Sequence, residues 1–163
     1  MRAVLNSSAI IALSLLKHLN KLRHLFENTL VASAVYDELC IAGRGLIGAT
    51  ELSEAVREGA IGVKGVEDRI LVNALTDSLS LGEAETIALT LKERADFIVL
   101  DDRSARRKAE KLGLNVIGTL RVLRMMFDNG LIDKEEFLTS IEKLREVGFR
   151  ISDKVVETLK KEL

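Results

Sequence analysis

The stretch Phe97-Ile98-Val99-Leu100-Asp101-Asp102-Arg103 carries the signals that decide the fold of this chain. Phe97 to Leu100 is a short apolar run, typical of a strand buried on both faces. Asp102 can cap a helix that continues to Leu112. A second strand is expected at Asn115 to Ile117, so the segment predicts two parallel strands joined by a crossover helix.

The rest of the chain repeats this alternation of short apolar runs and stretches with helical period. Ser80 and Glu83 form a capping box that opens a helix reaching about Arg94, and Asp133 with Glu136 repeats the pattern. Further strands are expected at Arg2 to Leu5, Thr29 to Ala32 and Ile61 to Val63. The other expected helices are 8–19, 34–41 (capped by Ser33), 50–58, 68–75, one capped by Thr119 that ends at Asn129-Gly130, one capped by Asp133 that stops at Gly148, and one capped by Ser152 that runs to Leu163.

Length and composition are typical of one globular domain spanning residues 1–163. Apolar residues make up 47% of the chain and charged residues 30%, and the net charge is −1. A single cysteine excludes an internal disulfide, which agrees with a reducing compartment. No segment approaches the roughly 20 apolar residues of a membrane span, so we expect a cytoplasmic protein with no membrane partner.

Polar and acidic residues follow the expected strands, where the carboxyl ends of parallel strands meet at one edge of the sheet. We expect four or more acidic side chains to converge there. Such a cluster repels itself unless a hard cation neutralises it, which favours Mg²⁺ or Mn²⁺ and metal-assisted phosphodiester hydrolysis by water. The candidate metal ligands are Asn6, Glu38, Glu83, Glu85, Asp101 and Asp102.

Three of these candidates also have a purely structural interpretation. The capping box alone explains Glu83, Asp102 can serve only as a helix cap, and Glu38 can be an ordinary solvated residue. A basic helix begins beside the predicted site, and its residues Arg103, Arg106 and Arg107 could contact the phosphates of RNA. Because the chain has five Phe, one Tyr and no Trp, we do not expect aromatic stacking to dominate RNA binding.

An ordered series of motifs resembles the PIN domains, in particular the branch that pairs a Gly-Glu-Ala-Glu helix with Asp-Asp-Arg. The resemblance covers residues 1 to about 151. It implies a three-layer α/β/α fold with a central parallel sheet of strand order 3-2-1-4-5, and a Mg²⁺- or Mn²⁺-dependent ribonuclease. The stretches that carry it are Val4-Leu5-Asn6-Ser7-Ser8, Ala34-Val35-Tyr36-Asp37-Glu38-Leu39, Leu81-Gly82-Glu83-Ala84-Glu85, Val99-Leu100-Asp101-Asp102-Arg103 and Val116-Ile117-Gly118-Thr119-Leu120.

Carried over by position, the resemblance implies that Glu38, Glu83 and Asp101 are the catalytic acids, with Glu85 and Asp102 as close alternatives. Ser8 would hold a water molecule or a carboxylate, and Thr119 would lie at the rim of the site. The family pattern has Asp at the first acidic position, where this chain has Asn6. An amide oxygen can still bind a cation, but it removes one negative charge from the site.

Three functional hypotheses follow. The first is a PIN-type ribonuclease that cleaves single-stranded RNA, with the resemblance also implying a homodimer and the toxin role of a toxin–antitoxin pair. The second is a weakened PIN-like domain that binds nucleic acid or a protein without cleavage, as the charge loss at Asn6 favours. The third is a phosphoacceptor signalling domain, which the lack of an acidic pair after the first strand disfavours.

Overall fold

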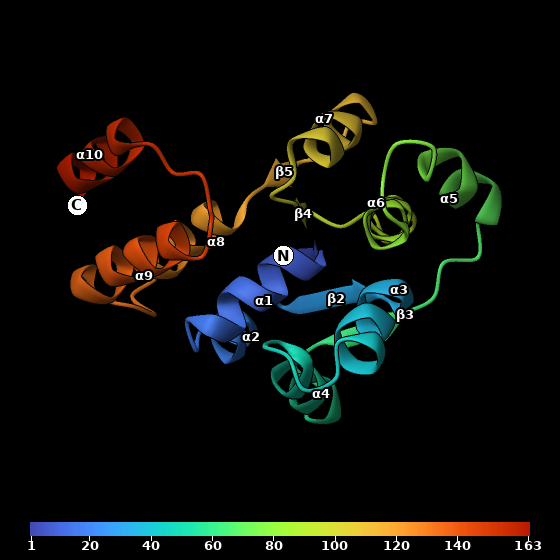
Figure 1. The fold of residues 1–163 in the computed structure, drawn as a ribbon, viewed down its shortest axis with the longest axis horizontal. Coiled ribbons are helices and arrows are strands. Elements are labelled where there is room, and N and C mark those ends of the chain that lie inside the picture. Colours follow the sequence, from blue (N-terminus) through green and yellow to red (C-terminus); the bar gives the residue numbers. More distant parts are fainter. The chain divides into compact units, whose positions relative to one another are not determined.

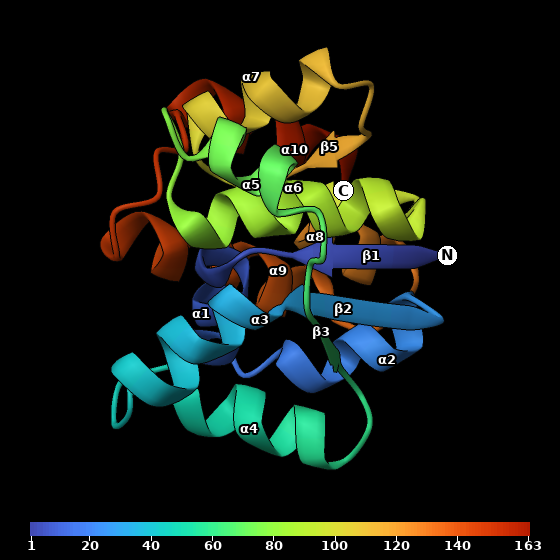
Figure 2. The same ribbon diagram turned by 90° about the vertical axis from the view of Figure 1, so that its right-hand side faces the viewer.

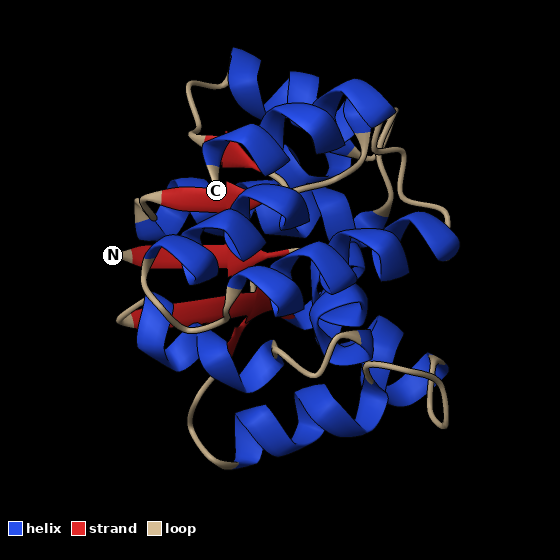
Figure 3. Cartoon of the chain, turned by 90° about the vertical axis from the view of Figure 1, so that its left-hand side faces the viewer, coloured by secondary structure: helices blue, strands red, loops and turns tan.

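A computed structural model describes residues 1–163, which divide into two compact units, Met1–Thr119 and Leu120–Leu163. The first unit holds a five-stranded parallel sheet of order β3-β2-β1-β4-β5, which confirms the predicted strand order. The strands are β1 (Arg2–Leu5), β2 (Asn28–Ala32), β3 (Gly62–Lys64), β4 (Phe97–Val99) and β5 (Val116–Ile117). Figure 3 shows them side by side between helices.

Helices cover both faces of the sheet. Figures 1 and 2 place α1 (Ser7–Leu15) and α2 (Leu22–Leu25) on one face and α6 (Leu81–Glu93) on the other. The first unit also contains η1 (Leu19–Lys21), α3 (Ser33–Tyr36), η2 (Asp37–Ala42), α4 (Ala49–Arg57), α5 (Arg69–Leu75) and α7 (Arg103–Lys111). This arrangement confirms the α/β class predicted from the alternating pattern.

The core lies between the sheet and these helices. Val4, Leu5, Ile98 and Val99 are fully buried in the paired strands β1 and β4, because helices cover both faces of the sheet. Ile87 and Leu89 of α6 are buried as well. Packing thereby fixes β1 and β4, and candidate site residues follow each strand within two residues of its end.

Several caps predicted from the sequence are present. Ser80 accepts the Glu83 N–H and Glu83 accepts the Ser80 N–H, so the capping box opens α6. Asp102 caps α7 by accepting the Ala105 N–H. The two residues of each pair lie three positions apart, so the local sequence alone was enough to predict these hydrogen bonds.

Other local predictions were wrong in detail. The helix expected at 8–19 ends at Leu15, because Lys17 adopts a left-handed conformation with φ of 61°. Ser33 is not a cap but the first residue of α3, and the Ala34 N–H is satisfied by Glu85 from α6 at 3.0 Å. That contact crosses 51 residues of sequence, so no local pattern could predict it.

The second unit is helical. It contains α8 (Thr119–Asp128, whose first residue belongs to the first unit), α9 (Lys134–Glu146) and α10 (Asp153–Glu162). Asp133 and Ser152 cap α9 and α10 as predicted. None of the helices in the chain is long and apolar enough to cross a membrane. The expectation of a single domain across 1–163 stays a prediction.

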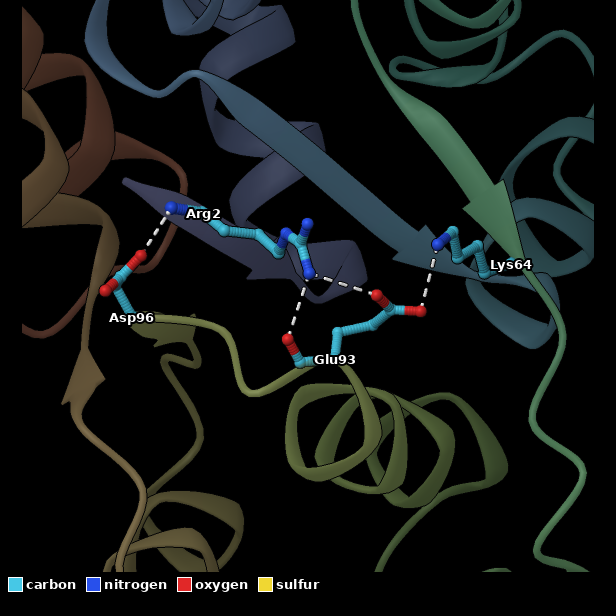
Figure 4. A network of polar contacts seen from close by, with 4 residues as sticks. All are labelled: Arg2, Lys64, Glu93 and Asp96. Carbon is cyan, nitrogen blue, oxygen red and sulfur yellow. Dashed lines mark hydrogen bonds and ion pairs between the residues drawn. The ribbon is translucent and has the colours of Figure 1, made fainter.

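A polar network ties the amino end of β1 to α6 and β3 (Figure 4). Glu93, at the end of α6, accepts hydrogen bonds from Arg2 at 3.2 Å and from Lys64 at 3.0 Å. The hydrogen bond from Lys64 lowers the pKa of Glu93 below its ordinary value of 4.5, partial burial of the carboxyl opposes the shift, and the charges of Lys64 and Arg2 reinforce it. The ionised form of Glu93 is therefore favoured in the folded state.

We predict that Glu93→Gln lowers the free energy of unfolding near neutral pH by no more than about 1 kcal/mol, because Arg2 and Lys64 are partly solvated. The folded pKa lies below the unfolded one, so the stabilisation is present above the unfolded pKa and is lost as pH falls through the folded value. Urea unfolding of both proteins across this pH range measures the difference. A difference that stays constant down to about pH 3 would contradict the assignment.

Candidate metal and nucleic-acid site

Asp101 lies at the carboxyl edge of the sheet, two residues after the end of β4. One carboxylate oxygen, Oδ1, accepts the backbone N–H of Thr119 at 2.8 Å. The other, Oδ2, accepts the Thr119 hydroxyl at 2.6 Å and the Ser8 hydroxyl at 3.1 Å. Residues after β1, β4 and β5 therefore meet at one carboxylate, and its orientation is fixed by three hydrogen bonds.

Asn6 and Glu38 form the other half of this edge. Asn6 follows β1, its N–H extends the ladder to the Val99 carbonyl at 3.2 Å, and only 7% of the residue is exposed. Glu38 reaches the edge from η2, and its Oε2 accepts the Ser7 hydroxyl at 2.8 Å. A Cβ built on Gly82 of α6 would lie 3.1 Å from Glu38 Oε2 and 3.7 Å from Asn6 Oδ1. The two oxygens therefore face the same bare position on α6.

The segment that carries Glu38 is a π-helical turn that continues α3. Its hydrogen bond runs from the Gly43 N–H to the Glu38 carbonyl at 2.8 Å, five residues back along the chain. A Cβ on Gly43 would lie 2.9 Å from the Glu38 carbonyl oxygen and 3.0 Å from that of Leu39, so a larger residue would open this turn. Wide turns of this kind are uncommon and are frequent at functional sites.

The remaining predicted acids make other contacts. Glu83 and Asp102 accept helix-capping N–H groups, as described above. Glu85 is buried, with Oε1 bound to the Ala34 N–H and Oε2 to Arg69 at 2.9 Å. No three Asp, Glu, His or Cys side chains lie close enough together to hold a metal ion. The fold thus does not gather the four or more acids that were expected, and three of the five candidate acids form helix caps or an ion pair instead.

The predicted RNA-contacting arginines differ in their surroundings. Arg103 and Arg107 are exposed on α7, whereas Arg106 is half-buried and donates to the Leu100 carbonyl at 2.8 Å. Only Arg106 is fixed beside the carboxyl edge of the sheet.

Two residues of this edge were given no role by the sequence. Ser7 lies directly after Asn6, and only the three-dimensional structure reveals its hydrogen bond to Glu38, 31 residues away. Gly82, by contrast, could have been noticed in the sequence. Glycine inside a helix costs about 1 kcal/mol relative to alanine, so its presence in the first turn of α6 indicates a close approach by other groups.

Comparison with known proteins identifies the family. The model of the DUF3368 family, described as a PIN domain, matches residues 2–163. The chain belongs to this PIN-domain family. PIN domains are generally nucleases that depend on divalent metal ions, and they often bind nucleic acids.

A solved structure has the same fold. A PilT N-terminus domain protein from the hyperthermophilic archaeon Sulfolobus solfataricus superposes with a TM-score of 0.50 at 18% identity, covering 87% of this chain and 95% of the other. At this identity the likeness concerns the fold alone. No curated protein matches the chain significantly.

The donors at this edge of the PIN domain fit a hard divalent cation. Glu38 and Asp101 supply carboxylate oxygens and Asn6 supplies an amide oxygen, and Gly82 leaves open the space that a Cβ would fill beside two of them. Mg²⁺ keeps several water ligands and commonly uses only one or two carboxylates together with substrate phosphates. An open site with few protein ligands is therefore chemically sufficient.

We predict that millimolar Mg²⁺ or Mn²⁺ raises the melting temperature by a few degrees, because a ligand at tenfold its Kd stabilises the folded state by about 1.4 kcal/mol. Glu38→Gln and Asp101→Asn should each reduce the metal-induced shift. Differential scanning calorimetry with and without metal measures it.

Glu54→Gln is the matched control, because Glu54 is an exposed carboxylate on α4 outside this edge. It should retain the full metal-induced shift. Equal shifts in all four proteins would show that the ions bind elsewhere.

Proposed function

We propose that this PIN domain is a metal-dependent ribonuclease that acts on single-stranded RNA, with its activity weakened by Asn6. The observation that carries the proposal is the pairing of Glu38 and Asn6 oxygens over Gly82, beside a fixed Asp101. These oxygens lie where ligands of parallel α/β sheets bind, outside the carboxyl ends of the strands.

In the proposed reaction, side chains at this edge hold the metal ion and orient the attacking water and the RNA phosphate. Glu38, Asp101 and Asn6 would bind Mg²⁺ or Mn²⁺, which lowers the pKa of bound water and offsets charge on the phosphate. Ser7 holds Glu38, while Ser8 and Thr119 hold Asp101, so neither carboxylate needs to reorient when substrate arrives. Glu83, Glu85 and Asp102 also accept hydrogen bonds within the fold, and in this proposal they keep those structural roles.

Asn6 limits what this site can do. An amide oxygen has no net charge and cannot take a proton from an attacking water molecule, and Asn6 is nearly buried next to Glu38. This observation favours a second candidate function, a PIN domain that binds RNA or a protein and cleaves weakly or not at all. The family assignment leaves the phosphoacceptor alternative without support.

The RNA and protein partners are part of the proposal. Arg103 and Arg107 are exposed cations on α7, the helix that begins directly after Asp101 and Asp102, and they suit the phosphates of a single strand. From the family resemblance we also propose that the protein acts as a toxin, that an antitoxin covers the site and that the chain forms a homodimer. Exposed Ile41, Leu46 and Ile47, close in sequence to Glu38, are compatible with a protein partner.

We predict that the wild-type protein cleaves single-stranded RNA slowly or not at all, and that Asn6→Asp raises metal affinity and cleavage together. A contact worth a few kcal/mol in the transition state corresponds to about a hundredfold in rate. Single-turnover cleavage of a labelled RNA, with isothermal titration of Mg²⁺ into the same preparations, measures both quantities.

The double variant Asn6→Asp with Asp101→Asn is the control for contaminating nuclease and should lose the gained activity. If Asn6→Asp folds normally and gains neither metal affinity nor cleavage, the ribonuclease proposal fails. The binding function then becomes the better interpretation.

A further inference from the structure

Arg106 differs from the other cations of α7 because its guanidinium is fixed next to Asp101. Its Nη1 donates to the carbonyl of Leu100, the residue that immediately precedes Asp101, at 2.8 Å. A Cβ built on Gly118 would lie 2.8 Å from this Nη1 and 3.1 Å from Asp101 Oδ1. The bare Cα of Gly118 therefore lets a cation and a carboxylate lie against the same short segment after β5.

The hydrogen bonds of Asp101 and Arg106 leave several N–H donors of the Arg106 guanidinium unused. Both oxygens of Asp101 are already bound by Ser8 and Thr119, and no ion pair joins Asp101 to Arg106. A guanidinium presents several N–H donors in a planar fork, of which the Leu100 carbonyl engages one nitrogen. Such a fork matches the oxygens of a phosphate group, and a partly buried guanidinium loses little side-chain freedom on binding.

We propose that Arg106 binds a phosphate group of the RNA directly beside Asp101, and that Gly118 provides the space that keeps it there. This proposal rests on the proposed function and deepens it by giving Arg106 a different role in RNA binding from the other arginines of α7. Arg106 contacts the phosphate at the reaction centre, whereas Arg103 and Arg107 contact the flanking backbone. Helix α7 does not need Arg106 for its start, because Asp102 already caps it.

The test uses inorganic phosphate as the probe, since it is too small to span to the flanking arginines. Phosphate is titrated into the full-length protein in the presence of Mg²⁺, and the amide signals of Gly118 and Thr119 are followed by NMR. Wild-type protein should show a saturable shift at both amides. Arg106→Gln should raise the Kd for phosphate about tenfold or more, because hydrogen bonds to charged groups contribute more binding free energy than those between neutral groups.

Lys111→Gln is the matched control, because Lys111 is an exposed cation at the far end of the same helix and its loss changes the net charge equally. Its phosphate Kd should change by less than about twofold, as screening weakens distant charges. Gly118→Ala should weaken phosphate binding as Arg106→Gln does, and the double variant should show no further loss, because both changes remove the same contact.

Three results would overturn the proposal: no saturable shift in the wild type, an unchanged Kd in a folded Arg106→Gln protein, or additive losses in the double variant. The amide spectrum of each variant reports whether it is folded, and the Gly118 variant tests the site without removing the arginine. Arg106-dependent phosphate binding without RNA cleavage by any variant would refute the nuclease and leave this inference standing. Cleavage with unchanged phosphate binding in Arg106→Gln would refute this inference alone.

Discussion

The carboxylate of Asp101 is the constraint on which the carboxyl edge of the sheet depends. Its oxygens accept hydrogen bonds from Ser8, at the start of α1, and from the backbone and hydroxyl of Thr119, after β5. Three chain segments that are distant in sequence thus share one charged group. The same contacts position a negative charge at the place where parallel α/β folds bind ligands, so they connect the fold to the candidate site.

Much of the fold is encoded locally and could be predicted. The capping pairs at Ser80 and Glu83 and at Asp133 and Glu136 are three residues apart, and buried apolar runs such as Phe97 to Val99 identify the strands. Parallel pairing followed from the alternation of strands and helices. The strand order itself came from resemblance to PIN domains, because local patterns do not specify which strands are neighbours.

The site was harder to predict, because a capping carboxylate and a metal-binding carboxylate have the same sequence signature. Glu83 satisfies a helix N-terminus and Glu85 pairs with Arg69, whereas Glu38 reaches the edge from a π-helical turn that no local pattern indicates. Contacts between distant residues, such as that of Ser7 with Glu38, are set only when the sheet assembles. The sequence thus predicted that polar residues meet at the carboxyl edge and showed the departure at Asn6, but it did not indicate which side chains contact each other there.

The central claim is that a divalent cation binds at the carboxyl edge of this sheet. Paramagnetic broadening of backbone amide signals by trace Mn²⁺ tests it most directly, because broadening falls off steeply with distance from the ion and needs no catalytic activity. The amides of Asn6, Glu38, Gly82 and Thr119 should broaden first. Early broadening at Arg2, Glu27 and Asp96, around the amino end of β1, with these four amides unaffected, would contradict the claim.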